Sequence, residues 1–285
     1  MDLTQLIKQL RDETGVSIME CKKALEKAEM DLDKARIILK EEGLARADKK
    51  AERETKAGII STFVTADNKI ASIVEFRCET DFVAKNEEFI NLANTIAKEV
   101  ALQNPSTIEE FLQKTITDGS ETIDSAIRSL VAKIGEKMEI TRFKRIETEG
   151  YVGSYVHAGS RLAVLLNVKA DKDIWNNNSV KELVTDLAMQ VAAMSPVSLT
   201  PDDLSPVELE NIKGFIMEEL EKENKPEEIK QKIMVGRLQK RFSDVCLYYQ
   251  PFIKNDSLTV EKLVEAKGKE LGAEIKVVEF IRYQS

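Results

Sequence analysis

The chain has 285 residues, of which 42% are hydrophobic, and a formal net charge of −8 at pH 7. This length corresponds to about two domains, and the apolar content is enough for folded cores. The acidic balance argues against nonspecific binding to nucleic acid or to an anionic membrane, because both prefer a clustered basic face.

The sequence also carries no pattern typical of export or membrane insertion. It does not open with a charged segment followed by an apolar core. Its longest apolar stretch, Leu162–Val168, is far shorter than the roughly 20 residues of a spanning helix. Cys21, Cys78 and Cys246 are odd in number and far apart, which fits neither a disulfide framework nor a zinc pattern. We therefore expect a cytoplasmic protein, in a reducing compartment.

Residues 1–55 predict a bundle of three short helices and a linker. Apolar residues recur at helical spacing in three groups, and Thr14-Gly15 separates the first two. We expect Gly43 to end the third helix, and the charged segment from Leu44 to Lys56 to form an exposed helical linker. The apolar groups are Leu3, Leu6, Ile7 and Leu10; Ile18, Cys21, Ala24, Leu25 and Ala28; and Leu32, Ala35, Ile38 and Leu39.

The rest of the chain contains an internal repeat. The segment from Gly58 to Val64 aligns without gaps onto Gly150–Val156, and the register continues through the next apolar stretch. Each half therefore opens with a predicted β-hairpin. An amphipathic helix follows in each half, and a closing strand recurs, because Gly135–Ile140 matches Gly272–Val277.

This pattern predicts an α+β fold in which sheets bury one face under helices. After the bundle we expect two subdomains, residues 56–148 and 149–285. The second subdomain holds an insertion at about 203–241, where two helical patterns flank the turn Asn224-Lys225-Pro226. We expect a projecting antiparallel helical hairpin. Its predicted seam consists of Leu209, Ile212, Ile216, Leu220, Ile229, Ile233 and Leu238.

Signals of enzymatic chemistry are poor. The sequence has neither a phosphate-binding G-x-x-x-x-G-K-[ST] loop nor a G-x-G-x-x-G turn. His157 is the only histidine, so a two-histidine metal motif is excluded and a general-base network is disfavoured. Cys78 lies in a predicted strand without a neighbouring histidine, which favours a buried thiol over a nucleophile. We expect no enzymatic activity, no cofactor and no bound metal, with a thiol enzyme built on Cys78 as a rival hypothesis.

The most informative segment joins a strand to a helix. Ile70–Phe76 alternates like a strand, and Asn86 is a good N-cap for the amphipathic helix that follows. Between them lie Thr80, Asp81, Phe82 and Val83.

Surface connections carry function, so an aromatic residue held there is a candidate interface anchor. The alternative is that Phe82 folds into its own core while Asp81 caps a turn. The repeat places Asp173 and Ile174 at the corresponding positions, and this partial match favours an inherited structural role.

This segment resembles the Thr-Asp-Phe-Val signature of bacterial translation elongation factor Ts. A second signature of that family matches Leu10–Leu25, and the resemblance extends along nearly the whole chain. It implies a bundle like a ubiquitin-associated domain and guanine-nucleotide exchange on the GTPase elongation factor Tu. In the family, the Asp and Phe of the motif, here Asp81 and Phe82, push between helices of the GTPase domain and displace Mg²⁺. Thr80 and Val83 shape this wedge.

The resemblance implies further partner contacts. Those in the bundle have helix packing as their alternative interpretation, and His157 lies on a predicted hairpin tip where simple solvent exposure is the alternative. Exposed tyrosines would suit an interface near position 250. These residues are Arg11, Thr14, Gly15, Val16, Met19, Lys22, His157, Tyr248, Tyr249, Pro251 and Phe252.

A different functional class stays open. A non-catalytic adaptor would dimerise through the helical hairpin, which mediates contact with a second copy in some family members, and would bind a partner without nucleotide exchange. Many members also continue past the last strand into another helical module, and the sequence here predicts none.

Overall fold

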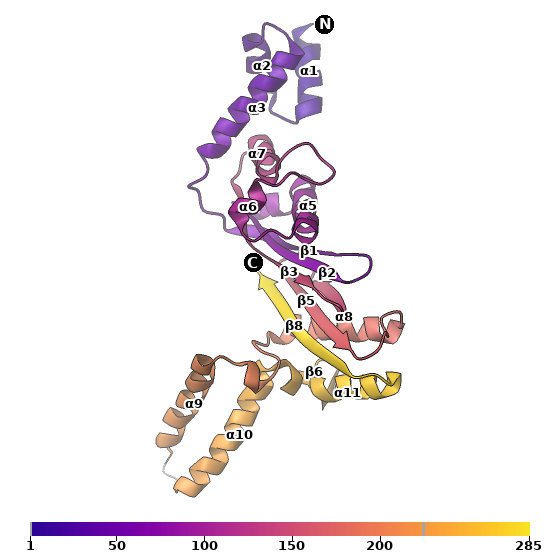
Figure 1. The fold of residues 1–285 in the computed structure, drawn as a ribbon. Coiled ribbons are helices and arrows are strands. Elements are labelled where there is room, and N and C mark those ends of the chain that lie inside the picture. The colour runs from indigo at the N-terminus through magenta and orange to yellow at the C-terminus, as the bar shows by residue number, and fades with distance from the viewer. Residues whose placement is uncertain (1, 224–225) are drawn as a thin grey trace.

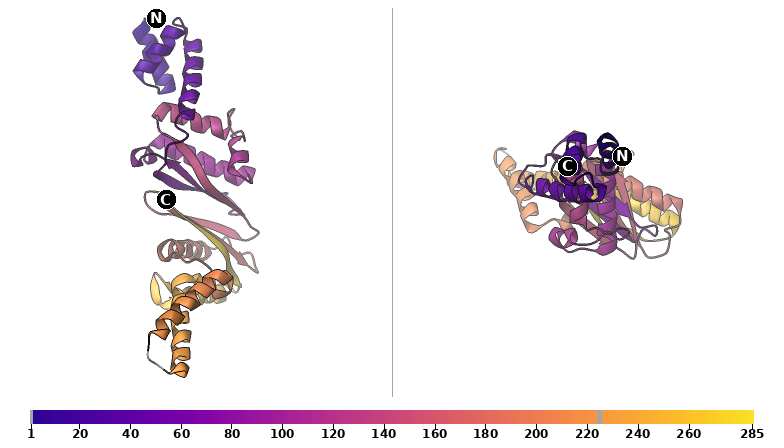
Figure 2. Two further views of the ribbon diagram at one scale, coloured as in Figure 1. Left: turned by 90° about the vertical axis from the view of Figure 1, so that its left-hand side faces the viewer. Right: turned by 90° about the horizontal axis from the view of Figure 1, so that it is seen from above.

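The computed structural model describes residues 2–223 and 226–285. It is an elongated molecule with the N-terminal bundle at one end and a helical hairpin at the other, while two small sheets with their helices form the middle (Figures 1 and 2). This arrangement confirms the predicted α+β class with three N-terminal helices. No helix in the described part of the chain is long and apolar enough to cross a membrane.

The bundle contains α1 (Leu3–Thr14), α2 (Ile18–Lys27) and α3 (Leu32–Asp48). Asp2 and Gln5 form a capping box at the start of α1, and Gly15 ends that helix in the left-handed region with φ 67°. Most of the predicted apolar positions form the bundle core, whereas Ile18 lies on the surface. The buried ones include Leu6, Leu10, Cys21, Ala24, Leu25, Ala28, Ala35 and Leu39.

Gly43 does not end the third helix, so that prediction was wrong. The helix α3 continues through Gly43 to Asp48, and the chain from Lys49 to Lys56 is not helical. A methyl group on Gly43 would lie 2.6 Å from the Cβ of Ala132 on α7 (Ile123–Ile134). The glycine therefore permits close packing of α3 on α7, and this contact docks the bundle onto the first subdomain.

The first sheet has the antiparallel order β1 (Ala57–Val64), β2 (Ile70–Cys78) and β3 (Met138–Glu147). The helices α5 (Glu87–Gln103) and α7 pack on it. The short helix α4 (Asp81–Ala84) precedes α5, and the short helix α6 (Ile108–Leu112) lies between α5 and α7 in sequence. Asn86 caps α5 as predicted, because its side chain accepts hydrogen bonds from the backbone N–H groups of Glu88 and Phe89. Phe76 of β2 stacks on Phe89 of α5 with ring centroids 4.6 Å apart.

The second sheet repeats this plan with β4 (Tyr151–Val156), β5 (Leu162–Ala170) and β8 (Ile275–Gln284). The helices α8 (Asn178–Met194) and α11 (Val260–Leu271) cover it. Both central strands shift register at equivalent positions, namely Glu75/Phe76 and Asn167/Val168.

The repeat also includes a second helix that the sequence analysis did not predict. The helices α7 and α11 correspond residue by residue. Each has a threonine N-cap, Thr122 or Thr259, and each ends at a left-handed glycine, Gly135 or Gly272.

The two sheets face each other across a shared apolar layer. Backbone bonds also cross this boundary, from Ile60 N to Ser160 O (2.6 Å) and from Val152 N to Asn68 O (2.8 Å). The Arg142 guanidinium lies 4.1 Å from the centroid of the Tyr283 ring. The layer consists of Ile60, Ala71, Ile73, Ile146, Val152, Ala163, Leu165 and Tyr283.

The projecting hairpin consists of α9 (Pro206–Glu221) and α10 (Glu227–Val245). The predicted turn lies partly outside the described residues, at 224–225. Ile216 and Leu220 are buried in the seam as predicted, whereas Ile229 was wrongly placed there, since it is 47% exposed. The remaining elements form the hairpin base and its surroundings: η1 (Pro201–Asp203), η2 (Leu247–Tyr249), β6 (Pro251–Phe252) and β7 (Asn255–Thr259).

Replacing Gly43 by alanine tests the docking contact. Alanine favours helix by about 1 kcal/mol over glycine, but its methyl group would overlap Ala132, and overpacking of this kind costs about 1–3 kcal/mol. We expect Gly43→Ala to accelerate amide hydrogen exchange in α7. Gly236→Ala in α10 is the matched control, because no atom lies within 4 Å of its new methyl group, and it should stabilise its own helix. Slower exchange in α7 of Gly43→Ala would contradict this account.

Candidate partner-binding site

The Thr80–Val83 segment forms the start of a single helical turn at the end of β2. Thr80 has an extended backbone, and its Oγ1 accepts a hydrogen bond from Val83 N (3.4 Å), so it is the N-cap of α4. The Thr80 carbonyl accepts from Ala84 N at 3.2 Å. Asp81 occupies the first turn, where a negative charge favours the helix.

This turn buries one side and exposes the other. Val83 and Ala84 belong to the core beneath the first sheet. Phe82 is 81% exposed, more than any other large hydrophobic residue in the described part of the chain. The alternative that Phe82 packs into its own core is therefore wrong. A phenyl ring left in water on a fixed turn has the geometry of an interface anchor.

Two carboxylates, both overlooked in the sequence analysis, hold the base of the turn. Glu136 accepts from Thr80 N (3.0 Å) and from Thr80 Oγ1 (2.8 Å). Glu79 accepts from Lys137 N (2.6 Å) and pairs with Arg53 at 3.2 Å. The Glu136–Thr80 and Glu79–Lys137 contacts each join positions more than fifty residues apart in sequence, so no local pattern could have indicated them.

Asp81 remains accessible. Its carboxylate pairs with Lys85 Nζ at 3.2 Å, one helical turn away, and its side chain is about half exposed. Exposed pairs of this kind contribute little to stability. Asp81 can therefore exchange Lys85 for another partner at small cost.

The corresponding segment of the second half turns inward. Ile174 packs against the core of that half, and Trp175 stacks on Tyr151 with centroids 5.6 Å apart. The outward ring at position 82 is thus a specific feature of the first half and does not follow from the repeated plan.

The bundle offers a second exposed apolar surface. Met19 is 62% exposed, and its neighbour Ile18, which the sequence analysis assigned to the core, is 53% exposed. Arg11 and Lys22 are also exposed, whereas Val16 is buried. The half-buried Thr14 donates its hydroxyl hydrogen bond to Leu10 O at 2.6 Å.

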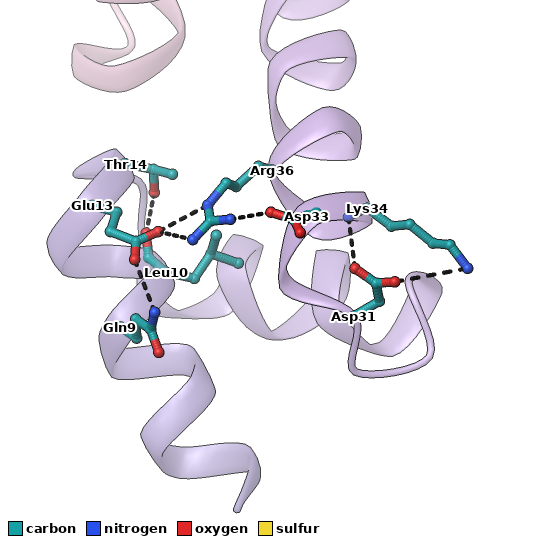
Figure 3. A network of polar contacts seen from close by, with 8 residues as sticks. All are labelled: Gln9, Leu10, Glu13, Thr14, Asp31, Asp33, Lys34 and Arg36. Atoms are coloured by element: carbon teal, nitrogen blue, oxygen red, sulfur yellow. Dashed lines mark hydrogen bonds and ion pairs between the residues drawn. The ribbon is translucent and has the colours of Figure 1, made fainter. Parts of the chain in front are cut away.

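Polar contacts join α1 to the first turns of α3 (Figure 3). Glu13 accepts from Gln9 and from Arg36 of α3, with Arg36 Nε and Nη2 at 2.9 and 2.6 Å. These hydrogen bonds, first from Gln9 and then from Arg36, lower the pKa of Glu13. The network ties α1 to α3 next to Gly15, within the bundle signature Leu10–Leu25.

The structure brings the two signatures to the same end of the first subdomain. Gly15 lies against the side chain of Lys133 near the end of α7. Three residues later, Glu136 binds Thr80. The linker contacts the same end of the first subdomain. Lys50 Nζ donates to Gly135 O, and Arg53 pairs with Glu79.

The remaining predicted contact residues lie in the second subdomain. His157 is exposed at the β4–β5 tip, with Nδ1 3.0 Å from the Tyr155 hydroxyl. Tyr249 at the end of η2 and Pro251 in β6 are exposed, while Phe252 is buried.

Tyr248 differs from the exposed tyrosine expected from the sequence. Its hydroxyl accepts from Val277 N at 2.8 Å, and burial raises its pKa. It connects η2 to β8 and leaves little surface for a partner.

Cys78 is completely buried and its thiol donates to Thr80 O at 3.1 Å. Burial, with a further contribution from the nearby Glu136 charge, raises its pKa to about 12. A nucleophilic cysteine requires the opposite shift. Among the described residues, no cluster of three or more His, Cys, Asp or Glu side chains could hold a metal ion.

The fold and site consist of a packed scaffold that presents exposed apolar side chains on short, fixed segments. The comparisons with known proteins are more specific. A family model described as "Elongation factor TS" matches residues 79–285.

Curated relatives named "Elongation factor Ts" cover the bundle as well. The protein from Clostridium kluyveri is 41% identical over 286 residues, which is 100% of this chain and 92% of the relative. The protein from Clostridium botulinum is 40% identical over 282 residues, covering 98% of this chain and 91% of the relative. The chain therefore belongs to the elongation factor Ts family, which confirms the resemblance of its two signatures.

The thiol environment can be tested by alkylation. All three cysteines are buried and free, and burial raises the pKa of each. The folded state therefore disfavours the thiolate at pH 8, and we expect less than about one-tenth of the thiols to react in the time that the urea-unfolded chain reacts completely. Rapid reaction of the native chain that disappears in Cys78→Ser would contradict this account and favour the thiol-enzyme rival.

Proposed function

We propose that this chain is a guanine-nucleotide exchange factor for elongation factor Tu in translation elongation. The observation that carries the proposal is the 81% exposed Phe82, held on a capped turn in a chain of the elongation factor Ts family. The ring has no packing role in its own subdomain, so its large apolar surface is available to another protein.

The proposed mechanism is mechanical. A GTPase holds GDP through backbone donors on its phosphate loop and through Mg²⁺, which bridges phosphate and protein. Phe82 enters between helices of the GTPase domain, Asp81 accompanies it, and the disturbed site releases Mg²⁺. The phosphates then lose charge compensation, and GDP dissociates. No covalent bond is made or broken, and nucleotide binding weakens the complex in return because coupling is reciprocal.

We infer from the free energies involved that the ring does not act alone. Complete burial of a phenylalanine side chain contributes about 1.5–3 kcal/mol, which corresponds to roughly 10- to 150-fold in an equilibrium constant. Association alone costs about 4 kcal/mol or more in lost translational and rotational freedom, so one ring cannot supply both binding and distortion. We propose that the exposed bundle residues Arg11, Met19 and Lys22, with His157 and Tyr249 in the second subdomain, add anchoring contacts while Phe82 delivers the distortion.

Truncating the ring tests the proposal. Phe82→Ala should reduce the acceleration of fluorescent-GDP release from elongation factor Tu by about 30-fold or more, since loss of a hot-spot anchor costs at least about 2 kcal/mol. Stopped-flow measurements over a concentration series of the chain would show it. Phe215→Ala is the matched control, because Phe215 lies on the helical hairpin and is 65% exposed.

Equal release rates with the wild-type chain and Phe82→Ala would refute the wedge. The adaptor alternative predicts tight binding to elongation factor Tu with no effect of the wild-type chain on GDP release, so the same titration separates the two functions.

A further inference from the structure

Every backbone and side-chain polar group of Thr80 has a partner within the chain. Its N–H and hydroxyl donate to the two oxygens of Glu136. Its carbonyl accepts from Ala84 N and from the Cys78 thiol. Its Oγ1 also accepts from Val83 N, as an N-cap does. The residue directly before the Asp81-Phe82 pair is therefore fixed from all sides.

Glu136 reaches Thr80 because of the turn that precedes it. The helix α7 ends at Gly135, whose φ of 90° is a left-handed conformation suited to glycine. Glu136 follows at once and precedes β3. Across the strand ends, two carboxylates bind the opposite backbone: Glu136 accepts from Thr80 N, and Glu79 accepts from Lys137 N. These bonds begin where the ladder of β2 and β3 stops, at Cys78 and Met138.

Comparison with the second half of the repeat shows which of these two carboxylate contacts both halves share and which occurs only in the first half. In the second half, Asp171 accepts from Glu274 N at 2.7 Å, which reproduces the contact of Glu79 with Lys137. Glu136, however, corresponds to Ala273, which has no carboxylate. The second carboxylate bond thus occurs only in the half that presents an exposed ring.

We propose that Glu136 is a positioning residue for the exchange reaction, which orients Phe82 through Thr80 without touching the partner. This inference rests on the proposed function. A single helical turn is not stable by itself, and ordering a flexible segment on binding lowers affinity. By fixing the N-cap before the partner arrives, Glu136 removes that cost from the encounter.

A titration of fluorescent-GDP release from elongation factor Tu with the full chain tests this role. Glu136→Gln preserves the shape of the side chain but removes one acceptor. We expect the concentration that gives half the maximal release rate to rise about tenfold, while the maximal rate stays within about twofold, because the partner can reorder the turn once bound. Phe82→Ala should instead lower the maximal rate.

A double-mutant cycle tests whether Glu136 acts through Thr80. Thr80→Val should raise the half-maximal concentration like Glu136→Gln, and the double variant should be no worse than the worse single variant. Thr80→Ser keeps the hydroxyl and should raise the half-maximal concentration far less than Thr80→Val does. Asp171→Asn alters the equivalent contact of the second half and should have no effect. Melting curves of each variant verify folding.

Two results would overturn the inference: a half-maximal concentration for Glu136→Gln equal to that of the wild type, or additive effects of the two substitutions. Either result, together with a strong loss in Phe82→Ala, would refute the positioning role alone. A wild-type chain that leaves GDP release unchanged would refute the proposed function and the inference together.

Discussion

The presentation of Phe82 depends on the division of one helical turn between core and solvent. Val83 and Ala84 are buried beneath the first sheet, which leaves Phe82 between Asp81 and a buried neighbour with its ring in water. Four helical residues gain too few hydrogen bonds to order themselves. The apolar core and the carboxylate of Glu136 supply the missing order, and the exposed ring therefore has a defined direction.

The duplicated plan shows what is structural and what is specific. Both halves share the register shift of the central strand, the capped helix before the last strand, and a carboxylate that closes the strand ends. They differ where the first half exposes Phe82 and the second half packs Ile174. Each half therefore has its own stable scaffold. Only the first half also presents an exposed aromatic ring.

Sequence periodicity predicted those features that depend on neighbours along the chain. These include the three apolar groups of the bundle, the repeat, the helical hairpin and the Asn86 cap. Features that depend on distant packing were missed. Glycine is a residue type that often ends helices, but Gly43 instead lies inside α3, where it permits close packing against Ala132. Glu136 resembles any surface carboxylate until the fold brings it to Thr80. The exposure of Phe82 was undecided for the same reason, because local sequence does not determine which way a ring points.

Covalent capture at position 82 tests the central claim most directly. A photoreactive phenylalanine analogue in place of Phe82 would be irradiated in the complex with nucleotide-free elongation factor Tu, with position 215 on the hairpin as control. The account predicts crosslinks between position 82 and helices of the GTPase domain, which decrease when GDP and Mg²⁺ are added. Crosslinks from position 82 only to its own chain would contradict it.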